Sequence, residues 1–193
     1  MDRDTELSLV EGLRSGDPGA FDLVYEAYRA RLFGFLVRLS RSRTVAEDLL
    51  DETWLRLVSN ARSLRADSYL LPWLFTVARN LYWTYRRSGL HEEAWDPAAL
   101  ALWPSPEASS SPFEAAAHDE LLGRLERALA QLSPRYREVL LLVGLEGLTP
   151  SEAAGVCGVT PEALRQRLAR ARAALAQALD LPRGGARRRS DAT

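Results

Sequence analysis

Apolar residues recur three or four positions apart through most of this chain, and that spacing constrains its fold more than any other feature. One face of an α-helix buries such a series, whereas a half-buried strand needs strict alternation. No alternating segment and no internal repeat stands out. We therefore expect an all-α protein, whose first long helix starts at Asp17-Pro18 and buries Phe21, Val24, Tyr25, Tyr28, Leu32, Phe35, Leu36 and Leu39.

Two further helices are expected in the first half of the chain. The first begins at a capping box of Thr44 and Glu47, in which each side chain bonds the other residue's backbone N–H. The second follows a polar loop over 63–68 and ends near Arg87. Their buried positions are predicted at Ala46, Leu49, Leu50, Thr53, Trp54 and Leu57, and at Leu70, Leu74, Val77, Ala78, Leu81 and Tyr85.

The periodicity stops between 89 and 117, in a segment rich in alanine, proline and serine. Such a composition is typical of a linker. We therefore predict two small helical domains, over 1–88 and 118–181, joined by a flexible linker over 89–117. The arginine-rich end, 182–193, is expected to be a disordered tail. Trp95, Trp103 and Phe113 leave open whether parts of the linker dock on something or form a solvated tether.

The segment 148–179 predicts two short helices joined by a tight turn. Thr149 and Glu152 form a capping box, Gly158 suits the turn, and Thr160 precedes a proline at the start of the second helix. This is the helix-turn-helix arrangement, whose second helix can enter a DNA major groove. An ordinary helical hairpin with a solvated charged face is the alternative. The candidate DNA-binding residues are Thr160, Glu162, Arg165, Gln166, Arg167 and Arg170.

The outward face of the helix that ends near Arg87 mixes indole rings with guanidinium groups. Aromatic rings stack on unpaired bases while arginines follow the phosphates, so this surface suits single-stranded or melting DNA. Packing against neighbouring helices is an equal alternative for Trp73 and Phe75, whereas Trp83 favours a DNA contact. The candidates on this face are Trp73, Thr76, Arg79, Asn80, Trp83, Arg86 and Arg87.

Charge is segregated along the chain, although the formal net charge is only −1. Residues 89–120 carry seven acids and no base, and 121–193 carry 12 arginines against seven acids. A cationic C-terminal part suits a polyanionic partner. The chain has a single cysteine, Cys157, which excludes an internal disulfide. We interpret Cys157 as a small buried packing residue rather than a reactive thiol. With no membrane-length apolar run and no signal peptide, a cytoplasmic protein is expected.

Together these segments resemble the bacterial extracytoplasmic-function (ECF) sigma factors of RNA polymerase. The resemblance lies in AEDLLDETWLRL at 46–57, LPWLFTVARNLYWTYRR at 71–87, and the block from LERALAQLSPRYREVLLLVGLEG through the helix-turn-helix. It implies that the first domain corresponds to sigma region 2 and the second to sigma region 4. Thr84, Ala153 and Cys157 depart from the family pattern, so promoter sequence cannot be carried over from relatives.

The resemblance assigns expected roles. The helix from Pro161 would read the minus-35 element. A flipped base of the minus-10 element would be captured by the loop with Arg65, Asp67 and Ser68 and by the face with Thr76, Arg79 and Asn80. The clamp helices of the largest RNA polymerase subunit would bind the otherwise ambiguous charged face of the second predicted helix. That face carries Asp48, Leu49, Asp51, Glu52, Leu55 and Arg56.

The resemblance further implies a promoter-specificity subunit that binds core polymerase, including its flap region, and promoter DNA, both duplex and melted. An anti-sigma factor is an expected partner. Membrane insertion, a small-molecule substrate and a cofactor are not expected. The alternatives are a stand-alone dimeric DNA-binding regulator and an enzyme. The arginine-rich and tryptophan-rich face argues against the regulator. The sequence offers an enzyme no nucleophile–base constellation, metal-ligand spacing or phosphate-binding glycine loop.

Overall fold

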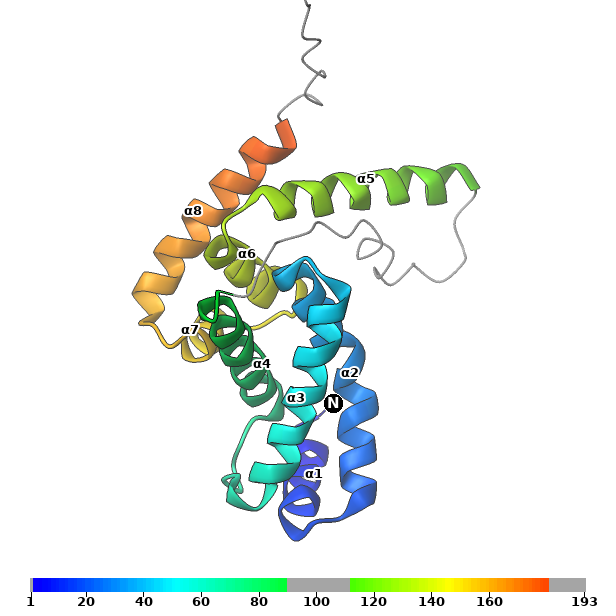
Figure 1. Cartoon of the computed structure of the whole chain (residues 1–193), viewed down its shortest axis with the longest axis vertical. Helices are drawn as coiled ribbons and strands as arrows, with labels where there is room; N and C mark the ends of the chain where they lie inside the picture. Colours follow the sequence, from blue (N-terminus) through cyan, green and yellow to red (C-terminus); the bar gives the residue numbers. More distant parts are fainter. Residues whose placement is uncertain (1, 90–111, 181–193) are drawn as a thin grey trace, which may run out of the picture.

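The computed structural model describes residues 2–89 and 112–180, and within these ranges it is all helical (Figure 1). Four α-helices and a 3-10 turn form the N-terminal unit, and four α-helices with a π-helical turn form the C-terminal unit. The first unit contains α1 (Arg3–Ser15), α2 (Pro18–Ser40), α3 (Arg43–Asn60), η1 (Ala61–Ser63) and α4 (Leu70–Arg87). The second contains α5 (Pro112–Gln131), α6 (Pro134–Leu140), η3 (Leu141–Leu145), α7 (Pro150–Cys157) and α8 (Pro161–Asp180).

Helix α1 was not predicted from the sequence. Asp2 caps it, because its carboxylate accepts a hydrogen bond of 3.0 Å from the Thr5 backbone N–H. Gly16 ends it in the left-handed conformation, at a φ of 81°. Leu9, Val10 and Leu13 are buried. Three buried apolar residues in thirteen give only a short apolar pattern, so α1 depends on packing against the helices that follow it.

The start of α2 agrees with the prediction, but the start of α3 does not. Pro18 occupies the first turn of α2, and the Asp17 carboxylate accepts from the Gly19 N–H at 2.9 Å. Helix α3 is capped by Ser42, whose hydroxyl accepts from Val45 N–H at 3.4 Å. The predicted capping box of Thr44 and Glu47 is therefore wrong. Both residues lie inside the helix, where Glu47 pairs with Arg43 at 2.8 Å.

The buried face of α4 is rotated from the predicted one. Phe75 and Tyr82 are buried, and the Phe75 ring meets Phe35 of α2 edge-to-face at 5.0 Å. Phe75 therefore packs in the core, and of its two predicted alternatives the surface role is wrong. Leu70, Leu74 and Ala78 are buried as predicted, whereas three other predicted positions are only half-buried, namely Val77, Leu81 and Tyr85.

The C-terminal unit begins at α5, whose first residue, Pro112, lies before the predicted domain start at 118. Ser133 precedes α6, and Pro134 occupies its first turn. After Leu140 the helix widens into the π-helical turn η3, and Gly147 then reverses the chain at a φ of 72°. The predicted linker residues 90–111, with Trp95 and Trp103, and the predicted tail lie outside the described residues.

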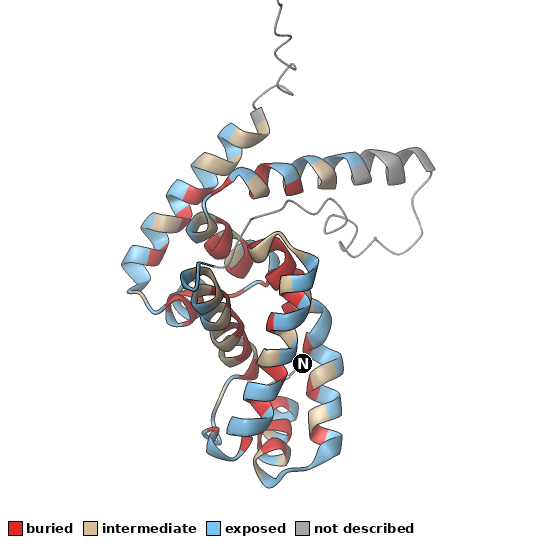
Figure 2. Cartoon of the chain, viewed as in Figure 1, coloured by how far each residue is buried: buried red, intermediate tan, exposed pale blue. Residues whose placement is uncertain are grey.

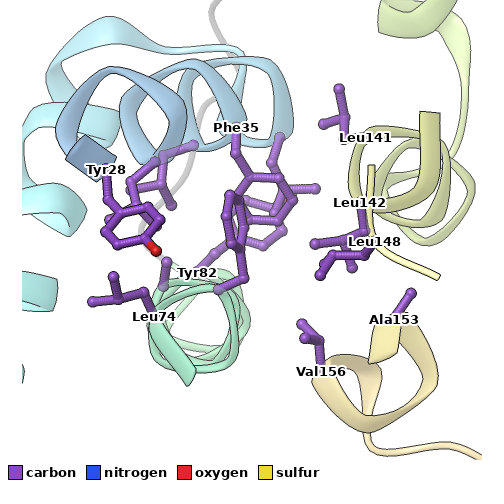
Figure 3. Close-up of a cluster of buried hydrophobic side chains, with 14 of the residues drawn as sticks. Tyr28, Phe35, Leu74, Tyr82, Leu141, Leu142, Leu148, Ala153 and Val156 are labelled. Atoms are coloured by element: carbon purple, nitrogen blue, oxygen red, sulfur yellow. The ribbon is translucent and has the colours of Figure 1, made fainter. Parts of the chain in front are cut away.

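The two units pack against each other through one continuous apolar cluster (Figure 3). Tyr28 and Phe35 of α2 face Leu74 and Tyr82 of α4, and Leu142 of η3 lies across from them. The exposed residues lie mainly on α8 and on the outer surfaces of α2 and α3 (Figure 2). In the described part of the chain, no helix combines the length and apolar character that a membrane span requires.

Candidate nucleic-acid interface

The helix-turn-helix of α7 and α8 has the predicted caps. Thr149 N–H donates to the Glu152 carboxylate at 2.8 Å, and Glu152 N–H donates back to the Thr149 hydroxyl at 3.3 Å. Gly158 makes the turn at a φ of 63°, a conformation that glycine adopts without steric cost. The Thr160 hydroxyl accepts from Ala163 N–H at 3.2 Å and caps α8. These bonds fix the direction in which α8 leaves the turn.

Helix α8 separates a buried face from an exposed polar face, as predicted. Leu164, Leu168 and Ala171 are buried against the rest of the unit. On the exposed side, Arg165 and Gln166 both donate to the Glu162 carboxylate, at 2.7 and 3.3 Å. These bonds and the Arg165 charge lower the Glu162 pKa. The candidates that remain exposed are Thr160, Glu162, Arg165, Gln166 and Arg170.

Arg167 occupies a different position from the other candidates of α8. It is half-buried and faces the N-terminal unit. There it lines a cleft of about 500 Å³ between α4 and the C-terminal unit. Four arginines line this cleft, together with a single carboxylate, that of Glu138. They are Arg79, Arg87, Arg135 and Arg167.

The candidate DNA-contacting face of α4 lies against the C-terminal unit. Arg79 Nε and Trp83 Nε1 each donate a hydrogen bond of 2.7 Å to the same carboxylate oxygen of Glu138. Glu138 lies at the middle of α6 and has no exposed surface. Two donors and the Arg79 charge offset part of the cost of removing this carboxylate from water, although its other oxygen, Oε2, is buried without a hydrogen-bond partner among the described residues. Trp83 is half-buried by this contact and does not project freely into solvent.

The remaining candidates of α4 differ in exposure. Asn80 is exposed, and its side-chain oxygen accepts from Arg79 at 3.0 Å. The Thr76 hydroxyl donates to Pro72 O at 2.7 Å, within its own helix. Trp73 packs half-buried against the core. Arg86 lies 5.9 Å from the centre of the Trp83 ring, and Arg87 is exposed.

Three further charged contacts join the units. Arg38 Nε donates to Glu126 at 2.6 Å, with both side chains buried. Arg31 donates to the Glu146 carboxylate at 3.0 Å and to the Glu146 carbonyl at 2.8 Å. Burial raises the Glu146 pKa, and the Arg31 charge offsets part of that rise. Arg137 is a donor from the C-terminal unit. It donates to the carbonyls of Arg38 and Leu39, at the end of α2, at 3.1 and 2.9 Å.

Residues 65–67 are exposed and Ser68 is half-buried, and hydrogen bonds within the loop over 65–68 close its turn. Ser68 N–H donates to Arg65 O at 3.0 Å, and Arg65 pairs with Asp67 at 3.0 Å. The bond to Arg65 holds the pKa of Asp67 below its usual value. Two residues that the sequence did not single out attach this loop to α1. Arg3 bonds the loop carbonyls and Glu6 bonds the first N–H of α4.

The charged face of α3 is largely as predicted. Arg56 pairs with Glu52 at 2.7 Å, and the exposed Leu55 lies beside Val58, another exposed apolar residue. Leu49 is the exception, because it is 7 % exposed and belongs to the core. Its side chain therefore packs inside the unit and does not face a partner. The exposed or half-buried candidates of this face are Asp48, Asp51, Glu52, Leu55 and Arg56.

Glu138 was also missed as a site residue. The only signal in the sequence is an acid placed directly before the apolar run Val139-Leu140-Leu141-Leu142. Cys157 is buried beside it, and burial, with the Glu138 charge second, raises the thiol pKa to about 12. This agrees with the packing role predicted for Cys157. No cluster of metal-ligating side chains occurs among the residues that the structure describes.

Family models match the chain in two places. Residues 24–89 match Sigma-70 region 2, and residues 122–175 match Sigma-70, region 4. The first range contains α3 and α4, and the second contains α7 and the part of α8 up to residue 175. Helix α1 precedes the first matched range.

Curated relatives match over most of their length. The chain is 32% identical over 161 residues to the RNA polymerase sigma factor CarQ of Myxococcus xanthus, covering 82% of this chain and 88% of that protein. It is 32% identical over 149 residues to the ECF RNA polymerase sigma factor EcfG of Rhodopseudomonas palustris, covering 77% of this chain and 78% of that protein.

Solved structures share the fold. CnrH, in complex with the cytosolic domain of CnrY, superposes with a TM-score of 0.68 at 24% identity, covering 91% of this chain and 97% of that one. The sigma factor RpoE of Bartonella quintana, in complex with the anti-sigma factor NepR, superposes with a TM-score of 0.63 at 26% identity. That match covers 84% of this chain and 99% of the other.

Proposed function

We propose, because this chain belongs to the extracytoplasmic-function sigma factors of bacterial RNA polymerase, that three of its surfaces divide the work of promoter recognition. The exposed face of α8 reads duplex DNA at the minus-35 element. The 65–68 loop and α4 capture and hold melted DNA at the minus-10 element. The exposed face of α3 binds core polymerase. The observation that carries this division is the exposed polar face of α8 on a fully capped helix-turn-helix.

The α8 face suits major-groove recognition. Arg165, Gln166 and Arg170 are exposed on one side of a helix whose other side is buried. Arginine and glutamine can each make paired hydrogen bonds to base edges. Glu162 holds Arg165 and Gln166 in place until bases replace it as their partner. We include Thr160 among the contacts because the N-terminal end of a recognition helix enters the major groove and also favours a phosphate group.

The α4 face suits unpaired DNA once the units separate. Trp73 and Trp83 offer stacking surfaces, and the arginines offer phosphate contacts, with Asn80 and Thr76 as polar groups. In the closed arrangement Glu138 occupies Arg79 and Trp83. We therefore propose that the C-terminal unit moves away from α4 when the protein binds polymerase and DNA. Arg86 and Arg87 would add phosphate contacts at the end of the helix.

The α3 face suits a protein partner. Leu55 is 61% exposed and lies near the exposed Val58, so a partner that docked here would bury an apolar pair inside a charged rim. The proposed contacts are Asp48, Asp51, Glu52, Leu55 and Arg56, docking on the clamp helices of the largest polymerase subunit. Leu49 is left out because it is buried. Contact between the C-terminal unit and the polymerase flap completes the proposed core interface.

An anti-sigma factor is a proposed partner as well. Of the two solved relatives, CnrH is in complex with the cytosolic domain of CnrY and RpoE with the anti-sigma factor NepR. We propose that this chain acts in the cytoplasm, where its polymerase lies, and does no covalent chemistry of its own. Its units are proposed to correspond to sigma region 2 over 1–88 and region 4 over 118–181, with 89–117 as the connection and 182–193 as a tail.

Transcription with purified core polymerase tests the proposal. We expect discrete transcripts from a pool of genomic upstream fragments only when the protein is added. R165A, Q166A or R170A should weaken binding to the minus-35 duplex and leave core affinity unchanged. D48A with E52A should lower core affinity and leave duplex binding unchanged. Equal loss of core affinity in both sets would contradict the division of roles. Dimeric binding to a duplex without any core binding would indicate a stand-alone regulator.

A further inference from the structure

Helix α1 packs against η1, and its first turn contacts the loop between η1 and α4. This loop, residues 64–69, is outside every α-helix and carries the exposed side chains of Arg65 and Asp67. Its own turn is closed by one backbone hydrogen bond, Ser68 N–H to Arg65 O. A short exposed loop with so few internal bonds needs external contacts to hold one conformation.

Arg3 supplies such contacts from the first turn of α1. One terminal nitrogen donates to the Ser68 carbonyl at 3.1 Å, and the other donates to the Asp67 carbonyl at 2.7 Å. The guanidinium also stacks on the ring of Tyr69, with its carbon 3.7 Å from the ring centre. A planar, forked donor can hold two consecutive carbonyls and a ring at once, which a lysine cannot do. Arg3 therefore contacts three consecutive residues of the loop.

Glu6, one turn further along α1, fixes the end of the loop. Its carboxylate accepts a hydrogen bond of 2.8 Å from the backbone N–H of Leu70, the first residue of α4. Tyr69 precedes that helix and makes no side-chain cap. The carboxylate thus caps α4 from another helix, next to the positive end of its dipole. Its second oxygen accepts from Arg3 at 2.7 Å, so the two residues act as one bonded pair.

We propose that Arg3 and Glu6 are positioning residues that set which base the 65–68 loop accepts at the minus-10 element. This inference rests on the proposed role of that loop in base capture. A flipped base is recognised by hydrogen bonds whose donors and acceptors must stay in place, so the loop conformation determines the preference. Neither residue needs to touch DNA to act in this way. The Tyr69 ring, 57% exposed beside the loop, offers a surface on which the base can stack.

The test compares base preference rather than activity alone. Run-off transcription uses purified core, full-length protein and a barcoded template pool with the minus-10 element randomised, and the RNA products are sequenced. R3A and E6Q should flatten the preference at the captured position by about tenfold, which corresponds to about 1.4 kcal/mol. R3K should restore only part of it, because an ammonium cannot bridge both carbonyls. Core affinity and minus-35 duplex binding should not change.

R14A is the matched control, because Arg14 lies on α1 and pairs with Glu11, away from the loop. D67A reports on the loop itself. A flattened preference in D67A with an unchanged one in R3A, R3K and E6Q would overturn the positioning role and leave the loop's role intact. An unchanged preference in D67A as well would overturn both. Equal flattening by R14A would show a general effect of α1, and would also overturn the inference.

Discussion

The Glu138 carboxylate is buried between two donors from α4, Arg79 and Trp83, at 2.7 Å each. Both donors are proposed to contact melted DNA, and Glu138 holds them in the closed arrangement. Opening the units would expose the carboxylate to water and free both donors. If α4 binds melted DNA as proposed, Glu138 both stabilises the closed arrangement and competes with that DNA.

We expect E138Q to tighten binding of a single-stranded minus-10 oligonucleotide by about tenfold, or about 1.4 kcal/mol. The amide keeps the size of the side chain but loses the charge that holds Arg79. Fluorescence anisotropy with a labelled oligonucleotide measures the change. E26Q is the control, since Glu26 forms an exposed pair with Arg29 on α2. Equal affinity of E138Q and the unaltered protein would refute competition by Glu138.

Glu146 gives a prediction for pH. Burial raises its pKa above the ordinary 4.5, and Arg31 reverses part of that rise. Between pH 4.5 and the raised pKa, the folded protein binds more protons at this site than the unfolded chain does. The contribution of Glu146 to the free energy of unfolding is therefore full below pH 4.5 and falls as pH rises through the raised pKa.

Urea denaturation across this pH range measures that contribution. The unaltered protein should lose stability through the window, and E146Q should show a flatter dependence because an amide does not titrate. E152Q does not serve as a control, since Glu152 is part of the capping box of α7. E26Q is again suitable, and it should keep the slope of the unaltered protein. A slope that is the same in E146Q would assign the titration to another group.

At the scale of single elements, two glycines of the helix-turn-helix should respond in opposite directions to alanine. Gly158 has a φ of 63°, whereas Gly155 lies inside α7, and an added Cβ meets nothing within 4 Å at either position. Only backbone conformation distinguishes them. We expect G158A to destabilise the protein by about 1 kcal/mol and G155A to stabilise it by about 0.5–1 kcal/mol.

Thermal and urea unfolding of both variants check this pair. G155A also controls for the effect of an extra methyl group in this part of the molecule. If both substitutions destabilised the protein equally, crowding rather than backbone conformation would explain the result. Duplex binding by G158A at low temperature should be weaker too, since the turn sets the direction of α8.

The helices most accurately predicted are those with long apolar faces or strong caps. The local sequence alone predicts α2 from its eight apolar positions and the start of α7 from the Thr149–Glu152 capping box. Helix α1 was missed because its three buried apolar residues give too short a pattern. The face of α4 was misplaced because Phe75 and Tyr82 are buried by α2 and the C-terminal unit, which a single-helix pattern does not contain.

The candidate site residues likewise fall into two groups: those that local helical spacing places, and those whose surroundings come from distant parts of the chain. The exposed face of α8 follows from helical spacing, so Arg165, Gln166 and Arg170 could be placed from the sequence. Arg167 and Trp83 could not, because their surroundings come from the opposite unit. Arg3 and Glu6 act on residues more than 60 positions away, and nothing in their local sequence indicates it. Long-range polar contacts of this kind leave no periodic signal.

At the scale of the whole molecule, the closed arrangement depends on buried charges. Arg38 and Glu126 are almost fully buried against each other, at 2.6 Å. Removal of one partner from such a pair costs about 3 kcal/mol or more, and opening the units relieves that cost by returning the remaining charge to water. E126A should therefore shift the protein toward an open arrangement while each unit stays folded.

Cys157 reports the shift, because it is the only cysteine of the chain and lies buried where α7 meets α4. Its thiol pKa is raised to about 12 in the closed arrangement, so a thiol reagent reacts slowly. We expect E126A to raise the labelling rate about tenfold or more, and E26Q to leave it unchanged. An unchanged rate in E126A would mean that this pair does not hold the units together.

The direction of these cross-unit ion pairs has a consequence for how such proteins diversify. Three ion pairs among the described residues join the units: Arg31–Glu146, Arg38–Glu126 and Arg79–Glu138. In each of them the arginine comes from the N-terminal unit and the glutamate from the C-terminal unit. A recombination event that joined the first half of one relative to the second half of another would bring together two halves with unmatched charges. Unless both halves kept these pairs, the hybrid would leave a buried charge, such as that of Arg38 or Glu138, without its opposite charge. The two halves are thus expected to be inherited as a matched set.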